Sequence, residues 1–102
     1  MDRTINEIVK TYANKVYNAY SPKAIYLYGS HAKGENNENS DIDVAIIINP
    51  IDINKYMEIF GKLWEIAAQI DGRIEPNLII DEGESDKFSM LYEVINTGER
   101  ID

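Results

Sequence analysis

The chain has 102 residues, a length that suits one domain with a single hydrophobic core. Hydrophobic residues make up 44% and charged residues 27%, values of an ordinary globular protein that argue against disorder and fibrous repeats. The formal net charge is −8 and no Lys- or Arg-rich stretch occurs, so direct binding to DNA or RNA is disfavoured and a basic protein surface is the better partner. There is no cysteine, which excludes disulfides, thiolate nucleophiles and zinc–thiolate clusters.

The N-terminal residues run directly into an amphipathic segment, where a secretory signal would have an apolar stretch. No apolar run approaches the ~20 residues that are needed to span a bilayer. We therefore expect a cytoplasmic protein that does not bind membranes, with residues 1–102 forming one domain.

A helix is predicted from Ile5 to Tyr20. Its apolar residues recur at spacings of three and four, which places them on one buried face. Thr4 and Glu7 have the spacing of a capping box at its start. Pro22 ends the helix because proline lacks a donor and restricts the residue before it.

Two strands and a loop follow. Aromatic and β-branched residues predict a strand over Ala24–Tyr28 that stops at Gly29, where glycine allows a sharp turn. Residues 33–39 are polar turn formers and predict an exposed loop. The next strand is predicted over Asp41–Ile48, and its second half, Val44–Ile48, is apolar on both faces, which indicates a central strand covered on both sides.

A longer helix is predicted over Ile53–Ile70 and ends at Asp71-Gly72. We expect one of its sides to be the buried one, with the residues Ile53, Met57, Phe60, Leu63, Trp64 and Ala67. Trp64 is accordingly expected in the core, although an exposed aromatic stripe there would mark a partner surface.

The last third of the chain predicts one strand and one helix. The strand covers Ile74–Ile80, and Pro76 inside it favours a sheet edge because proline cannot donate to a ladder. An acidic turn over residues 81–84 leads to Ser85, the expected N-cap of a helix that Gly98 stops. Its apolar residues are Phe88, Leu91, Tyr92 and Ile95. The order of elements predicts an α/β (α+β) fold with a small mixed β-sheet covered by helices.

Asp41 and Asp43 are the first candidate site residues. Alternate residues of a strand share a face, so the two carboxylates point the same way and repel each other. A divalent cation would neutralise that repulsion, and hard oxygen ligands suit Mg²⁺ or Mn²⁺. The alternative is that Asp41 only finishes a loop while Asp43 faces solvent.

Gly29 and Ser30 end the strand before this pair. Backbone N–H groups and a hydroxyl can cradle phosphate oxygens there, and Lys33 could add a positive charge or be simply solvated. A phosphate cradle beside paired carboxylates is what phosphoryl or nucleotidyl transfer needs, with one or two metal ions bridging the phosphates.

The spacing of Gly29-Ser30 and Asp41-Ile42-Asp43 resembles the signature of the DNA polymerase β-like nucleotidyltransferase superfamily. The longer segments, residues 29–34 and 40–44, are similar to the minimal nucleotidyltransferase, or MntA-type, family. The resemblance covers nearly the whole chain. It implies a third carboxylate on the strand after the long helix, where the family usually has aspartate and this chain has Glu75.

The resemblance implies the activity, the cofactor and the partner. Members of this family are antitoxins that transfer AMP from ATP to a tyrosine of a HEPN-domain ribonuclease toxin. Asp41 and Asp43 would then be ligands of Mg²⁺, Glu75 a further ligand and the base, and Gly29, Ser30 and Lys33 would hold the nucleotide.

Two other functions remain open at this stage. One is an antitoxin that blocks its toxin by binding alone, since Glu75 replaces an aspartate and the loop has His31 and Lys33 where the family commonly has arginine. The other is transfer to a small acceptor such as an aminoglycoside, although such enzymes usually carry an extra substrate domain.

Several side chains also have an ordinary structural interpretation. Glu75 could be a solvated charge on an edge strand. His31 is expected to be a solvated loop residue without a catalytic role. Tyr26 and Tyr28 alternate with aliphatic residues, as packing in a strand requires, so core packing is their default role.

Overall fold

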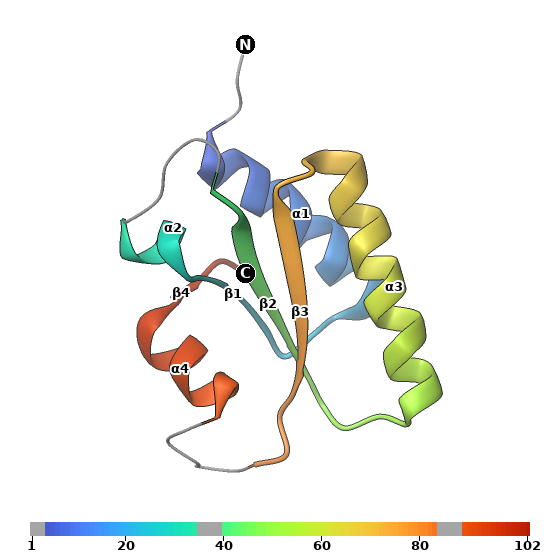
Figure 1. Cartoon of the computed structure of the whole chain (residues 1–102). Coiled ribbons are helices and arrows are strands. Elements are labelled where there is room, and N and C mark those ends of the chain that lie inside the picture. Colours follow the sequence, from blue (N-terminus) through green and yellow to red (C-terminus); the bar gives the residue numbers. More distant parts are fainter. Residues whose placement is uncertain (1–3, 35–39, 84–88) are drawn as a thin grey trace.

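The computed structural model describes residues 4–34, 40–83 and 89–102, which form a four-stranded sheet with helices on both faces (Figure 1). The elements in chain order are α1 (Ile5–Tyr20), β1 (Ala24–Tyr28), α2 (Ser30–Lys33), β2 (Ile42–Ile48), α3 (Ile53–Ile70), β3 (Ile74–Ile80), α4 (Met90–Thr97) and β4 (Glu99–Arg100). The strand order is β3-β2-β1-β4, with β1 antiparallel to β2 and β4, and β2 parallel to β3. The predicted fold class is confirmed. None of the helices in these ranges is long and apolar enough to cross a membrane.

Strand β2 lies inside the sheet, as its apolar sequence predicts. Val44 and Ile46 face the main core under α1 and α3. Ala45 and Ile47 point to the opposite face, where α4 lies and Val94 is buried (Figure 1). All four strand residues are at most 3% exposed, so both faces of β2 are covered.

Helix α1 begins and ends where the sequence predicts. The Thr4 side chain accepts a hydrogen bond from the Glu7 N–H (3.2 Å), and Ser21 adopts a left-handed conformation (φ 46°) at the C-cap. The buried Tyr12 hydroxyl donates to the Leu63 carbonyl of α3 (2.9 Å), and burial raises the pKa of Tyr12 far above its ordinary value. This bond joins the two helices that cover the main core.

The predicted buried side of α3 is only partly right. Ile59, Leu63 and Ala67 are the buried residues, whereas Ile53 is 69% exposed and Trp64 42% exposed. The prediction that Trp64 belongs to the core is therefore wrong. The helix is apolar around more than half of its circumference, so its periodicity does not decide which apolar stripe faces the sheet.

The two edges of the sheet differ in how well the sequence predicts them. Strand β3 is an edge strand, as Pro76 predicts. The opposite edge is the two-residue β4, which was not predicted because so short a strand has no periodicity to detect. It continues to the chain end: the Ile101 N–H donates to the Ile25 carbonyl (2.9 Å), and the Ile25 N–H donates to the Asp102 carboxylate (3.0 Å).

Helix α4 starts later than predicted. Its N-cap is Ser89, whose hydroxyl accepts from the Tyr92 N–H (3.0 Å), while Ser85 and Phe88 lie outside the described residues. The stop at Gly98 is confirmed, and its N–H donates to the Val94 carbonyl (2.8 Å). The one-turn helix α2 was not predicted because four residues are too few for a helical pattern.

Candidate active site

Three neighbouring strands bring polar side chains together at one end of the sheet. In the strand register Tyr28 of β1 lies opposite Asp43 of β2, and Asp43 lies opposite Glu75 of β3. Residues in register share a face, so one hydroxyl and two carboxylates form a row across the sheet. This face is the one opposite the main core.

The carboxylates predicted as metal ligands are close together. Asp41 is exposed and ends the loop one residue before β2, whereas Asp43 and Glu75 are half-buried. Glu75 lies close to both aspartates. Burial, followed by the negative charges of Asp41 and Asp43, raises the pKa of Glu75.

The pKa of Asp43 is also raised, by burial first and then by the charge of Asp41. The interaction with Glu75 lowers the pKa of Asp43, which is a weaker effect. A cation bound between these carboxylates would relieve the repulsion between them.

Gly29 fits the site for a steric reason. It has φ +74°, and a Cβ atom added there would overlap Oδ2 of Asp43. Glycine thus allows both the left-handed turn and the close approach of the turn backbone to the carboxylate. The predicted phosphate cradle therefore lies directly beside the predicted metal ligand.

The side chains of Ser30 and Lys33 lie outside what the structure describes. Their backbones form α2, which begins directly after Gly29. The predicted contacts of these two side chains with a nucleotide remain predictions.

His31 is not the solvated loop residue that the sequence suggests. It lies in α2, is half-buried, and its Nε2 is 3.3 Å from the Ser40 carbonyl oxygen. Its positive charge when protonated lowers the pKa of Asp43, although burial and Asp41 outweigh this effect. His31 therefore connects α2 to the residue that precedes the aspartates.

The sequence predicts ordinary strand packing for Tyr28, but in the structure Tyr28 lies beside the carboxylates. Its hydroxyl accepts a hydrogen bond from the Asn77 side chain, and burial together with the charges of Asp43 and Glu75 raises its pKa. The sequence signal for this position is that β1 and β2 flank one loop. If the two strands pair antiparallel, the last residue of β1, Tyr28, comes opposite Asp43.

Among the described residues, no three His, Cys, Asp or Glu side chains form a ready-made metal site. Proteins usually hold Mg²⁺ through one or two carboxylates together with substrate phosphates and water. The donor set of Asp41, Asp43 and Glu75 consists of hard oxygen atoms and suits such a partly built site.

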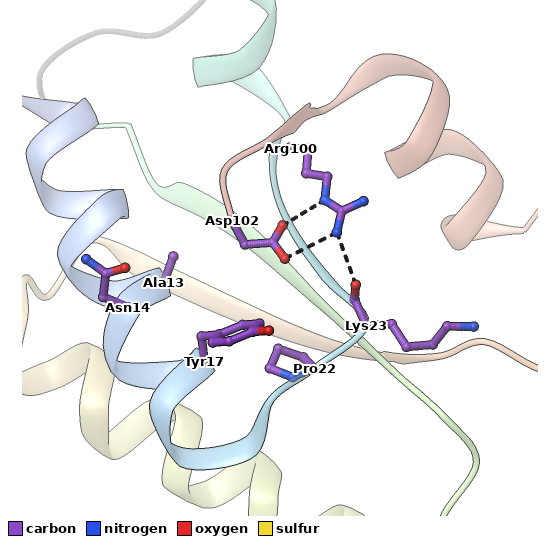
Figure 2. Close-up of a pocket in the computed structure, with 7 residues that line it drawn as sticks. All are labelled: Ala13, Asn14, Tyr17, Pro22, Lys23, Arg100 and Asp102. Carbon is purple, nitrogen blue, oxygen red and sulfur yellow. Dashed lines mark hydrogen bonds and ion pairs between the residues drawn. The ribbon is translucent and has the colours of Figure 1, made fainter.

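A pocket of about 330 Å³ lies elsewhere, at the other end of β1 (Figure 2). Figure 2 shows Arg100 between the Asp102 carboxylate (3.0 Å) and the Lys23 carbonyl (3.3 Å). The Lys23 ammonium is paired with Asp81 (2.8 Å). Arg100 and Lys23 thus already bind partners within the chain. We therefore interpret the residues of this pocket as holding the edge of the sheet together, and we do not assign them a catalytic role.

The mixed sheet and the carboxylates at its strand ends are the arrangement of a nucleotidyltransferase fold. The family model described as polymerase beta, nucleotidyltransferase matches residues 4–101. The chain therefore belongs to this nucleotidyltransferase family, and the resemblance seen in the sequence is confirmed.

Two similar proteins of Methanocaldococcus jannaschii are named as candidate protein adenylyltransferases. One is 51% identical over 39 residues, which cover 38% of this chain and 30% of the relative. The other is 36% identical over 63 residues, which cover 61% of this chain and 64% of the relative. The chain thus spans less than two thirds of the length of either relative.

Solved structures of toxin–antitoxin complexes share the fold. A toxin–antitoxin with AMP-PNP has a TM-score of 0.59 and 26% identity, covering 91% of this chain and 72% of that chain. A mutant of the toxin–antitoxin MntA–HpeT has a TM-score of 0.57 and 21% identity over the same shares. These similarities show that the chain shares the fold of the matched chains.

Proposed function

We propose that this chain is a nucleotidyltransferase that moves AMP from ATP to a tyrosine of a HEPN-family toxin and acts as its antitoxin. One observation carries the proposal: Asp43 and Glu75 lie in register on adjacent strands, and the Gly29 backbone lies against the Asp43 carboxylate. A triphosphate held at the Gly29–Ser30 turn would have its phosphates beside the carboxylates.

Asp41 and Asp43 would hold the divalent cation that carries the triphosphate. Burial, and then the charge of Asp41, raises the pKa of Asp43, so a positive charge placed between the two carboxylates is favoured. Mg²⁺ or Mn²⁺, when bound, supplies charge neutralisation for the phosphates and for the departing pyrophosphate. Lys33 and the Ser30 hydroxyl are the proposed additional contacts to the phosphates.

Glu75 would act as the general base as well as a cation ligand. The tyrosine oxygen attacks the α-phosphorus, the bond from the α-phosphorus to the bridging oxygen of pyrophosphate breaks, and the hydroxyl proton passes to Glu75. A raised pKa favours this role, because a base is most effective when its pKa lies near the working pH.

The choice of a protein acceptor rests on the similar proteins and on charge. The relatives are named for protein adenylyl transfer, and a similar solved structure is a toxin–antitoxin with AMP-PNP. A net charge of −8 favours association with a basic RNA-cutting protein.

The direct test follows label from ATP to the toxin. With Mg²⁺ present, label on the α-phosphate should pass to the toxin, whereas label on the γ-phosphate should leave with pyrophosphate. Asp43→Asn should abolish transfer, and Glu82→Gln, which changes an exposed acid outside the site, should not. Full transfer by Asp43→Asn would disprove the assigned role of this carboxylate.

A further inference from the structure

Helix α3 lies on the other side of the sheet from α4 (Figure 1), and exposed apolar side chains lie on its outward side. We call this surface the α3 stripe, and it consists of Ile53, Met57, Phe60, Gly61 and Trp64. Ile53, Met57 and Trp64 are 69%, 58% and 42% exposed. Phe60 is half-buried and makes an edge contact with Trp64, with ring centroids 6.5 Å apart. Large apolar side chains gathered on one exposed helix face mark a surface that binds a partner.

The α3 stripe contains a glycine, Gly61, that packing within this chain does not require. Glycine weakens the interior of a helix relative to alanine. A Cβ atom added at Gly61 would meet no atom within 4 Å, so packing inside this chain does not require glycine there. A glycine at the border of an exposed apolar stripe lets the backbone of a second element approach closely, as at helix–helix contacts.

The stripe continues into a groove beside β3. A cavity of about 320 Å³ there is lined by Ile51, Ile53, Tyr56, Leu78 and Ile80. Ile53 belongs to both the groove and the stripe, so the two form one apolar surface. It runs from the outward side of α3 to the edge strand.

The edge of β3 is poorly suited to pairing with an added strand. Pro76 has no N–H to donate, and the Tyr56 hydroxyl already donates to the Leu78 carbonyl (2.6 Å). The Ile74 N–H donates to the Asp71 carbonyl (3.2 Å). An occupant of this surface therefore binds through side chains, in the manner of an amphipathic helix in a groove.

Charge distinguishes between possible occupants. Glu58 and Glu65 follow the stripe on its solvent side, with side chains 70% and 58% exposed, each near one lysine at 3.5 and 3.4 Å. A second copy of this chain would bring its own charge of −8 and the same glutamates to the contact. Lys55 and Lys62 neutralise these glutamates locally, so it is the net charge of the whole chain, −8, that favours a basic partner.

We infer that the α3 stripe and its groove bind the apolar face of a helix of a basic partner protein. Under the proposed function, on which this inference rests, that partner is the toxin. The site of AMP transfer and the docking surface are then separate parts of the antitoxin. Anchoring the toxin on α3 would leave the carboxylates free to engage a tyrosine on another part of it.

The test measures binding of the co-expressed HEPN-domain toxin to variants of the full chain. Gly61→Leu and Ile53→Glu should each raise the Kd at least tenfold while binding Mg²⁺-ATP as the unmodified chain does. Ile95→Glu is the matched control, because Ile95 is 48% exposed on α4 and should leave the Kd within twofold. Gly61→Leu should not lower the Tm of the isolated chain, since the position opens to free space.

Other results would overturn the inference. Unchanged toxin affinity in Gly61→Leu and Ile53→Glu would do so, and so would stronger loss in Ile95→Glu. A homodimer in solution that Ile53→Glu dissociates would show that a second copy occupies the surface. Asp43→Asn separates the two proposals: it should bind the toxin normally without transferring AMP. If the unmodified chain binds the toxin through α3 but transfers no AMP, the proposed function fails and the docking surface stands.

Discussion

Replacement of Gly29 by alanine tests the close contact between the turn and the carboxylate. Gly29 has φ +74°, a left-handed conformation that costs a residue with a side chain about 1–2 kcal/mol. The added methyl group would also overlap Oδ2 of Asp43. The variant should therefore lose stability and displace a proposed metal ligand at the same time.

Gly34 separates these two effects. It has φ +72°, and a Cβ atom added there would meet nothing within 4 Å. Gly34→Ala should thus have the backbone cost of about 1–2 kcal/mol alone. In Gly29→Ala the Asp43 carboxylate must also retreat by about 1 Å, and a misplacement of that size can lower a reaction rate by about 100-fold.

The assay combines urea unfolding with the rate of AMP transfer at saturating Mg²⁺-ATP. We expect both variants to fold, and Gly29→Ala to transfer AMP about 100-fold more slowly than Gly34→Ala. Equal transfer rates in the two variants would refute the idea that Gly29 positions Asp43.

Three other variants test the fold, the charge of the site and the helix face. Tyr12→Phe leaves the buried Leu63 carbonyl without its donor, so urea unfolding should show a loss of about 1–3 kcal/mol while AMP transfer by the folded protein is unchanged. The pKa of Glu75 is raised above its ordinary 4.5, so the folded chain keeps a proton that the unfolded chain loses, and stability falls as the pH rises through and above that value. Glu75→Gln, unfolded in EDTA at a series of pH values, should therefore reduce this fall and be more stable than the unmodified chain at neutral pH; an unchanged slope would contradict the assigned shift. Gly61→Ala should stabilise the isolated chain by about 1 kcal/mol, a rise in Tm of about 4–8 °C by calorimetry, because the methyl group meets no neighbour; a fall in Tm would show that the helix needs glycine for its own packing.

The sequence predicts the position of a strand in the sheet best where a single local property of that strand decides it. Val44–Ile48 is apolar on both faces, and only a central strand can bury both, so its position could be inferred without any contact information. Pro76 places β3 at an edge for an equally local reason. Strand alternation also predicts that Asp41 and Asp43 lie close together, and the charge of Asp41 does act on Asp43, although β2 begins only at Ile42.

Features that depend on pairing between distant segments could not be predicted in this way. The row of Tyr28, Asp43 and Glu75 exists because β1 and β3 flank β2 in one particular register, which no single segment determines. The exposed side of α3 depends on how the helix is rotated over the sheet, and both of its stripes are apolar. The closure of the β1 edge by Asp102 depends on a carboxylate taking the place of a backbone acceptor.

Intact-mass measurement of the HEPN-domain toxin, after incubation with this chain, ATP and Mg²⁺, tests the central claim most directly. The account predicts that the toxin gains the mass of one or more AMP groups on tyrosine, that Glu82→Gln supports the same gain, and that Asp43→Asn gives none. An unchanged toxin mass with the unmodified chain, or an equal gain with Asp43→Asn, would contradict it.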